Sequence, residues 1–539
     1  GPQIARDGKD LVDWIAVQEW SDGRLGMIGA SYQGFAQYAV ASQRPAALKA
    51  IFPEIAGFDD YTSMFYPGGI FVAALSDSAS DSIRHDDLND YLPDASRPHL
   101  PSVPVIDEDG DGDLRDEIPL DRNGNGTFLD DGPPTYADGH PRTDLYYAAS
   151  KAHAANRNLP ADLVAAAPYR DSPIAGTSYR YVDLDPGNKP EAIAASGIAV
   201  YNRGGWFDYH ARDTVMWFAT LQGKTPTHVM MAPVGHGGLP AAAGEAIYRS
   251  GPYLALLGDT SSTNAAMNRE KLAFFDHYVK GIANGFERRP PVLLYVMGKG
   301  WRYEREWPLS RAVPLRLALS AGGRLQPGKG KPGTDTYPVD LTASTMTAGA
   351  NRWNFALSTS KVPLTFDGQK TTRLTYTGDV LAANTEVTGH PLVELSLAST
   401  VADGDVFAYL EDVAPDGTSL LVTEGQLRAN YWRVQPVGAA AIAKPALPWH
   451  GYAKMDYVPQ PFAGGKPLTL RFDMMPTAWV FRQGHRIRLS FAGADWPAFP
   501  LHPGLSASND PVGADTRHPV WTIRRAQSSL TLPVVPEHK

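Results

Sequence analysis

The stretch that decides the fold reads Arg24-Leu25-Gly26-Met27-Ile28-Gly29-Ala30-Ser31-Tyr32-Gln33-Gly34. Residues 24–28 are mostly apolar and predict a short buried strand, and the small residues over 35–41 predict a helix that packs closely on a sheet. A serine between them, flanked by glycines, is typical of a nucleophile elbow, a sharp turn that projects the hydroxyl above the sheet. Gln33 stands where the common G-x-S-x-G pattern has its last glycine, so an ordinary serine in a glycine-rich turn stays the alternative.

Composition limits the classes of protein. The chain has 539 residues, which predicts roughly two to four domains. A net charge of -9 and a pI of about 5.9 argue against a nucleic-acid partner, because no broad basic surface is available to neutralise phosphates. The absence of cysteine excludes disulfides, thiolate metal sites and cysteine nucleophiles. No apolar run is long enough to predict a membrane span.

The elements around the elbow predict a parallel α/β sheet. Residues 7–18 show an apolar stripe with helical spacing, and 48–52 read as the next buried strand. A nucleophile elbow normally follows several strands, and here only one precedes it. We therefore expect further strands to complete this sheet, in a longer form of the protein or in a separate N-terminal fragment.

Over residues 58–190 the sequence no longer alternates between strand and helix patterns. We interpret this segment as an insertion that forms a helical cap. Two acidic stretches lie within it, at 107–113 and 121–126, and both place oxygen side chains at positions 1, 3 and 5 with glycine at position 6. That spacing wraps side chains around one hard cation, so it predicts structural calcium, with a solvated acidic loop as the alternative. The candidate ligands are Asp107, Asp109, Asp111, Asp113, Asp121, Asn123 and Asn125, with Asp116, Glu117, Asp130 and Asp131 to complete the shells.

Parallel-sheet patterning returns after residue 190. Strands are predicted at 193–201, 227–233 and 291–297, and helices at 211–221 and 268–280. Asp208 and His236 each follow the carboxyl end of a predicted strand, where α/β folds place chemistry. The chain order Ser31, Asp208, His236 is that of an α/β-hydrolase triad.

From residue 299 onward the pattern changes to short alternating segments separated by turns, for example at 392–397, 407–411, 468–474 and 486–491. This predicts an all-β sandwich of jelly-roll type over 299–539. The catalytic domain is then expected over 1–57 and 191–298, with the cap insertion at 58–190 between its two parts.

Several widely spaced motifs occur together in this order: residues 20–34, Gly205-Trp206-Phe207-Asp208, Ala232-Pro233-Val234-Gly235-His236, 274–278, 307–309, 407–417 and 481–487. With them the chain resembles the cocaine esterase/X-Pro dipeptidyl peptidase group of serine hydrolases over nearly its whole length apart from the cap. The resemblance implies an α/β-hydrolase domain, a helical cap and a C-terminal jelly roll. It also implies Ser31 as nucleophile, His236 as base, Asp208 as the orienting acid and the Tyr32 backbone N–H as one oxyanion donor. The group's second donor, a tyrosine on an earlier strand, has no counterpart here.

The sequence determines the residues that would bind the substrate less clearly than it determines the triad. Phe58, Tyr61, Phe65, Trp206 and Tyr209 are candidates for an aromatic acyl pocket, with ordinary packing as the alternative. The amino-acid ester hydrolases of the group bind the substrate ammonium with a carboxylate cluster, part of which comes just after the triad acid. Tyr209 and His210 stand at those places here, which argues against recognition of a free α-amino group, although Asp59 or Asp60 matches another member of that cluster.

The expected activity is hydrolysis of a small carboxylic ester. An amidase, acylase or X-Pro dipeptidyl peptidase activity is the alternative within enzymes. An inactive, calcium-stabilised carbohydrate-binding protein is the alternative of another class. No organic cofactor, nucleic acid or membrane span is expected, and assembly into a homo-oligomer stays open. Calcium loops suit a calcium-rich exterior, so we expect a periplasmic or secreted protein, with the cytoplasm as the alternative.

Overall fold

The computed structural model describes residues 2–77, 167–174, 177–236, 263–346, 352–353, 372–436 and 447–536, together with isolated residues between 83 and 156. The chain forms two compact units, one of Gly1–Leu75 with Ala167–Lys539 and one of Ser76–Ala166. Residues 58–75 and 167–190, which sequence patterning assigned to the cap, thus belong to the first unit. The second unit lies almost wholly outside the described residues.

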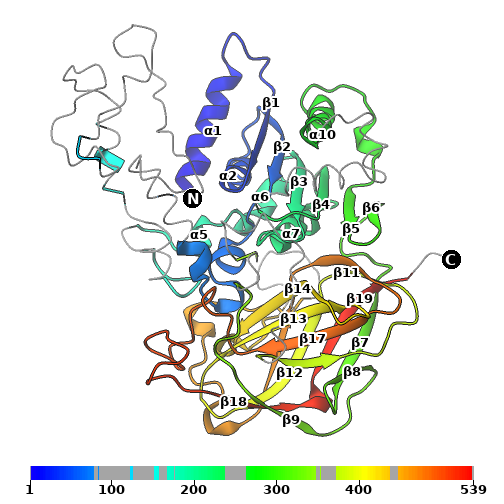
Figure 1. The fold of residues 1–539 in the computed structure, drawn as a ribbon. Coiled ribbons are helices and arrows are strands. Elements are labelled where there is room, and N and C mark those ends of the chain that lie inside the picture. Colours follow the sequence, from blue (N-terminus) through cyan, green and yellow to red (C-terminus); the bar gives the residue numbers. More distant parts are fainter. Residues whose placement is uncertain are drawn as a thin grey trace. The chain divides into compact units, whose positions relative to one another are not determined.

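The first sheet consists of strands β1 to β6, which lie among the helices of the first unit (Figure 1). Its strands lie in the order β1-β2-β3-β4-β5-β6, all neighbours being parallel except β5 and β6. Their bounds are β1 Leu25–Ala30, β2 Leu48–Glu54, β3 Ala199–Gly205, β4 Thr227–Ala232, β5 Val292–Val296 and β6 Gly300–Glu304. Among the described residues β1 is an edge strand, and the expectation of further strands beside it stays a prediction.

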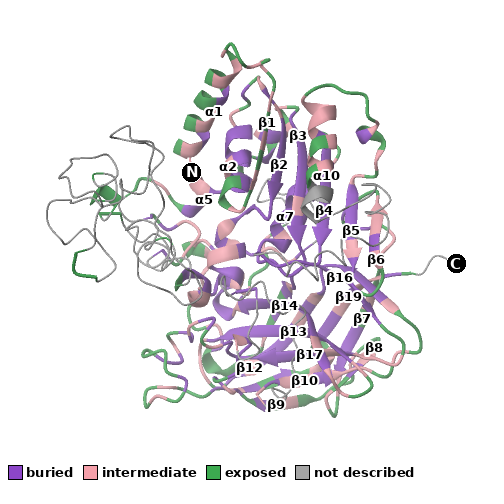
Figure 2. Ribbon diagram, turned by 45° about the horizontal axis from the view of Figure 1, so that its top comes forward, coloured by how far each residue is buried: buried purple, intermediate pink, exposed green. Residues whose placement is uncertain are grey.

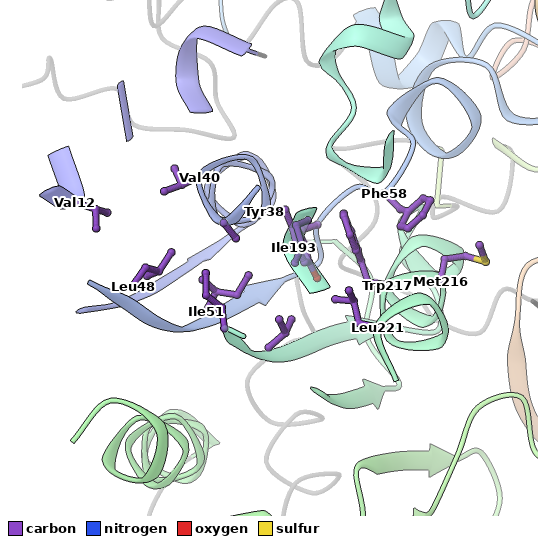
Figure 3. Close-up of a cluster of buried hydrophobic side chains, with 14 residues drawn as sticks. Val12, Tyr38, Val40, Leu48, Ile51, Phe58, Ile193, Met216, Trp217 and Leu221 are labelled. Atoms are coloured by element: carbon purple, nitrogen blue, oxygen red, sulfur yellow. The ribbon is translucent and has the colours of Figure 1, made fainter. Parts of the chain in front are cut away.

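Helices cover both faces of this sheet. One face packs against α1 (Pro2–Ala16), α2 (Tyr32–Ala41), α6 (Pro190–Ala194) and α7 (Ala211–Leu221), and Figure 3 shows the apolar cluster between them. The other face packs against α10 (Thr263–Tyr278), whose Phe274 lies in a second cluster. The sheet is therefore the middle layer of three, as expected of an α/β fold. None of the helices in the described part of the chain has the length and apolarity needed to cross a membrane.

Two details of the sheet differ from the sequence prediction. The strand expected at 193–201 begins only at Ala199, because Pro190 starts the short helix α6 and Gly197, with a φ of 71°, provides the turn after it. Ile193 is buried as a helix residue instead. The sheet also extends beyond the expected boundary at 298, since β6 pairs antiparallel with β5.

The C-terminal β-region, residues 313–536, is built almost entirely of antiparallel pairs, and its central strands are buried (Figure 2). Its strands are β7 Val313–Ser320, β8 Arg324–Pro327, β9 Thr334–Pro338, β10 Leu374–Thr377, β11 Thr385–Gly389, β12 Leu392–Ser399, β13 Asp405–Val413, β14 Ser419–Arg428, β15 Leu468–Asp473, β16 Thr477–Phe481, β17 Arg486–Ala492, β18 Val520–Arg524 and β19 Ser529–Val535. The all-β prediction is confirmed, and the jelly-roll topology stays a prediction. Backbone hydrogen bonds of Met297 with Ala478 and Val480, each 2.9 Å long, join this region to the first sheet.

Candidate active site

Ser31 lies on the turn between β1 and α2. Its backbone adopts φ 55° and ψ -122°, a conformation that L-residues rarely take and that costs free energy. Its N–H donates to the carbonyl oxygen of Glu54 at 2.9 Å, which ties the turn to the neighbouring strand β2. The structure therefore shows the strained strand-to-helix turn that the motif predicted.

Two glycines are required for this turn. A Cβ on Gly29, whose φ is 152°, would lie 2.5 Å from the Cβ of Gln33. A Cβ on Gly34 would lie 2.7 Å from the Cβ of Ala56 and 3.1 Å from the carbonyl oxygen of Glu54. Gly34, one position later than in the common pattern, thus permits the close approach of α2 to the chain that follows β2.

Three side chains distant in the sequence meet at this turn. His236, which follows β4, places Nε2 3.0 Å from Ser31 Oγ and Nδ1 2.9 Å from the Asp208 carboxylate. Asp208 follows β3 and is 1% exposed, and His236 is 8% exposed. The structure thus brings together all three residues of the predicted triad, in an order that lets the histidine accept the serine proton while the carboxylate binds its other nitrogen.

The carboxylate of Asp208 stays ionised although it is buried. Burial alone would raise its pKa, but the charge and hydrogen bond of His236, with the nearby His210, lower the pKa below its ordinary value. The backbone N–H of His210 donates to Asp208 Oδ1 at 2.6 Å, so one carboxylate oxygen is held by the backbone and the other by His236. A fixed anion in this position orients the imidazole and stabilises its charged form.

Tyr209 is the candidate pocket residue that contacts the triad. Its ring stacks on the ring of His236, with centroids 4.4 Å apart and an angle of 22° between the planes. Burial, aided by the charges of Asp208 and Asp60, raises the pKa of the phenol well above its usual range, and a hydrogen bond with the Ser31 side chain opposes that shift. The phenol is therefore neutral and lies next to the candidate nucleophile.

The other four pocket candidates make packing contacts. Phe58 packs edge-on against Trp217 in the core, and Trp206 is buried with its Nε1 donating to the carbonyl oxygen of Tyr295. Tyr61 stacks on Tyr66 at 5.0 Å and donates to the Pro168 carbonyl oxygen, and Phe65 lies 6.1 Å from the ring of Tyr181. These contacts support the packing alternative for these residues, and an acyl pocket stays a prediction.

A buried polar network lies beside the triad acid. His210 Nδ1 lies 3.3 Å from Asp213 Oδ2 and 3.2 Å from Ser63 Oγ, while the N–H of Phe58 donates to the same Asp213 oxygen at 2.7 Å. Burial raises the pKa of the nearby Asp60 to about 6. Sequence analysis did not single out Asp213, whose signal is its place three residues after His210, in the first turn of α7. The network fixes the loop after β2 against the start of that helix.

One cavity of about 310 Å³ lies between the two regions of this unit, and its lining includes Asp59, Arg170, Arg212, Trp449 and Tyr452. None of the described residues around it belongs to the triad. Arg212 stacks on Trp449 and binds Asp473 at 3.0 Å, and Arg170 binds Asp59 at 2.9 Å, so both cations are already paired with carboxylates. We do not assign this cavity to the substrate.

The calcium prediction falls on the second unit. Apart from Asn123, the candidate ligands lie outside the described residues. Calcium therefore stays a prediction from the spacing of the two loops.

Comparison with known proteins identifies the family. The family described as X-Pro dipeptidyl-peptidase (S15 family) matches residues 1–109, and the X-Pro dipeptidyl-peptidase C-terminal non-catalytic domain matches residues 284–527. A relative from Mycobacterium bovis, provisionally named a serine esterase, is 31% identical over 98% of this chain and 79% of its own. The cocaine esterase of a Rhodococcus species is 24% identical over 92% of this chain and 77% of its own.

Solved structures support the same fold. A CocE/NonD family hydrolase from Staphylococcus aureus superposes with a TM-score of 0.61 at 17% identity, covering 98% of this chain and 76% of that one. An α-amino acid ester hydrolase superposes with a TM-score of 0.62 at 17% identity, covering 98% of this chain and 80% of that one. The sequence relatives, the fold and the meeting of Ser31, His236 and Asp208 agree, and the chain belongs to the cocaine esterase and X-Pro dipeptidyl peptidase group of serine hydrolases.

Proposed function

We propose that this protein hydrolyses carboxylic esters through an acyl-enzyme on Ser31. The observation that carries the proposal is the unbroken hydrogen-bonded chain from Ser31 Oγ through His236 to the Asp208 carboxylate, with links of 3.0 and 2.9 Å. A serine hydroxyl is a poor nucleophile until a base takes its proton, and these distances allow direct transfer.

In the first half-reaction Ser31 Oγ attacks the ester carbonyl carbon while its proton passes to His236 Nε2. The resulting tetrahedral intermediate collapses, the bond to the alcohol oxygen breaks, and the imidazolium gives its proton to that oxygen. In the second half-reaction His236 takes a proton from water while the water oxygen attacks the acyl carbon. The new tetrahedral intermediate collapses, the bond between the acyl carbon and Ser31 Oγ breaks, and the imidazolium returns its proton to Ser31 Oγ as the acid leaves. Asp208 stays ionised throughout and stabilises the imidazolium.

The oxyanion of the intermediate needs hydrogen-bond donors. Tyr32 is the first residue of α2, so its N–H belongs to the first turn, whose donors have no partner within the helix. These donors and the positive end of the helix dipole are directed towards charge that develops next to Ser31.

Ester rather than amide hydrolysis is supported by the relatives. The relative at 31% identity is provisionally named a serine esterase, and the one at 24% is a cocaine esterase. A Bacillus cereus relative, provisionally named an Xaa-Pro dipeptidyl-peptidase, is 21% identical over 56% of this chain. Amide hydrolysis uses the same three side chains but needs stronger proton donation to its leaving group.

The test combines covalent labelling with a substrate screen. A fluorophosphonate probe should label Ser31 in the wild type and the Ser21→Ala control, and should label neither Ser31→Ala nor His236→Ala. p-Nitrophenyl esters should be cleaved faster than the matched p-nitroanilides and X-Pro anilides. Preferential cleavage of the anilides would overturn the ester assignment, and an unlabelled Ser31 in the folded wild type would favour the binding-protein alternative.

A further inference from the structure

The turn that carries Asp208 is hydrogen-bonded by a residue of the C-terminal β-region. Arg352, which lies in the C-terminal β-region, donates from Nη1 to the backbone carbonyl oxygen of Asp208 at 3.0 Å and to that of Trp206 at 3.3 Å. Arg352 is 6% exposed, so these contacts are shielded from water. One guanidinium nitrogen thus holds both ends of the three-residue turn after β3.

A carboxylate holds the guanidinium in place. Glu424 accepts from Arg352 Nε at 2.7 Å, and both side chains are 4% exposed. Burial raises the pKa of Glu424, although the charge and hydrogen bond of Arg352 oppose the shift. Each buried charge is therefore compensated by the other, and removal of either side chain leaves an uncompensated ion in the interior.

The residues beneath this contact are paired and packed within the β-region. Glu424 lies on β14, which pairs along its length with β13, where Tyr409 is opposite Glu424. The next residue along the chain from Arg352, Trp353, is buried in an apolar cluster and packs edge-on against Phe499. The β-region therefore presents the guanidinium to the Asp208 turn from a packed site.

We propose that Arg352, held by Glu424, is a positioning residue for the triad acid, through which the β-region sets the approach of Asp208 to His236. The inference rests on the proposed function, because it assumes that the Ser31, His236 and Asp208 triad does the chemistry. It assigns a role in catalysis to a domain whose family description calls it non-catalytic. Asp208 binds His236 with one carboxylate oxygen, so a shift of its backbone changes that bond directly.

A second ion pair across the two regions provides a matched control. Arg302 on β6 binds Glu386 on β11 through two hydrogen bonds of 2.8 and 2.6 Å. Glu386 is 3% exposed, and the hydrogen-bond partners described for its side chain are Lys299, Arg302 and Thr388. Loss of this pair weakens the junction of the same two regions without touching the Asp208 turn.

The first experiment compares Arg352→Met with Arg302→Met. Thermal unfolding measures the stability of each variant, and fluorophosphonate titration counts active sites. With a p-nitrophenyl ester, we expect Arg352→Met to lower kcat per active site by about tenfold to a hundredfold, because small displacements of a catalytic group have effects of that size. KM should stay within about twofold, and Arg302→Met should lower stability but leave kcat nearly unchanged.

The second experiment asks whether Arg352 acts through Asp208. In an Asp208→Ala background, Arg352→Met should cause no further loss of kcat, because residues that act as a unit are not additive. Arg352→Lys keeps the charge and one donor and should restore part of the lost kcat, and it replaces Arg352→Met if the latter does not fold. Glu424→Gln keeps an acceptor for Nε and should be milder than Arg352→Met.

Two outcomes overturn the inference while the proposed function survives. In the first, Arg352→Met has the same kcat as Arg302→Met. In the second, Arg352→Met lowers kcat by the same factor in the wild type and in the Asp208→Ala background. Failure of the proposed function looks different, since Ser31 of the wild type would then not be labelled at all.

Discussion

The ring of Tyr209 stacks on the ring of His236, with centroids 4.4 Å apart and planes inclined by 22°. This contact limits the rotation of the imidazole, whose two nitrogens must face Ser31 and Asp208 at once. The tyrosine hydroxyl also interacts with the Ser31 side chain. Tyr209 therefore touches both reacting members of the triad.

We expect Tyr209→Leu to lower kcat by about tenfold or more, because the imidazole loses the surface that orients it. Tyr209→Phe keeps the ring and loses only the hydroxyl, so its loss should be about twofold to tenfold, the value of one hydrogen bond. Steady-state kinetics with a p-nitrophenyl ester measure both. Tyr376→Leu, which removes a fully buried tyrosine elsewhere, is the control, and an equal loss there would contradict the role of Tyr209.

Gly34→Ala should destabilise the elbow. The new methyl group would meet Ala56 Cβ at 2.7 Å and the Glu54 carbonyl oxygen at 3.1 Å, so α2 must move away from the chain after β2. We expect a loss of unfolding free energy of about 1–3 kcal/mol, the usual cost of overpacking, with a reduced rate of labelling at Ser31. Gly404→Ala has open space around its Cβ and should leave thermal unfolding nearly unchanged. Equal stabilities of the two variants would contradict the packing argument.

His228 on β4 should make stability depend on pH. The residue is 7% exposed and its ring stacks on Tyr201 at 5.8 Å, and burial, with the charges of Arg289 and His277, lowers its pKa to about 4. The folded state binds the neutral ring, so this contribution is complete above the unfolded pKa of about 6.5 and is lost as the pH falls towards 4. The shift corresponds to about 3 kcal/mol.

Thermal unfolding between about pH 7 and pH 4 checks this linkage. The melting temperature of the wild type should fall more steeply with acid than that of His228→Phe, which keeps an aromatic ring and cannot titrate. The exposed His518 offers a control, and His518→Gln should follow the wild type. Parallel curves for wild type and His228→Phe would show that the buried imidazole contributes nothing.

Chelation tests the calcium loops at 107–113 and 121–126. We expect EDTA to lower the melting temperature, excess Ca²⁺ to restore it, and Mg²⁺ to fail, because the spacing suits a larger cation with more oxygen ligands. Asp111→Asn with Asp121→Asn should melt early with or without EDTA, whereas Asp379→Asn on the β-region should keep the response. An unchanged melting temperature and activity in EDTA would contradict the prediction.

The sequence alone was sufficient for the parts of the fold that depend on local pattern. The glycine-flanked Ser31 turn, the helix at Ala211–Leu221 and the strand at Thr227–Ala232 follow from local sequence, because apolar segments bounded by turn residues mark buried elements. The order of Ser31, Asp208 and His236 at strand ends also predicted that they would meet, since parallel strands end at one edge of a sheet.

Only the tertiary structure decided what surrounds these residues. An aromatic side chain has the same composition signal in a core as in a pocket, so the sequence could not tell that Phe58 packs against Trp217 while Tyr209 stacks on His236. Arg352 carries no local signal either, because its partners Asp208 and Glu424 lie 144 and 72 residues away. Contacts between regions depend on how whole layers pack, and no short stretch of sequence records that packing.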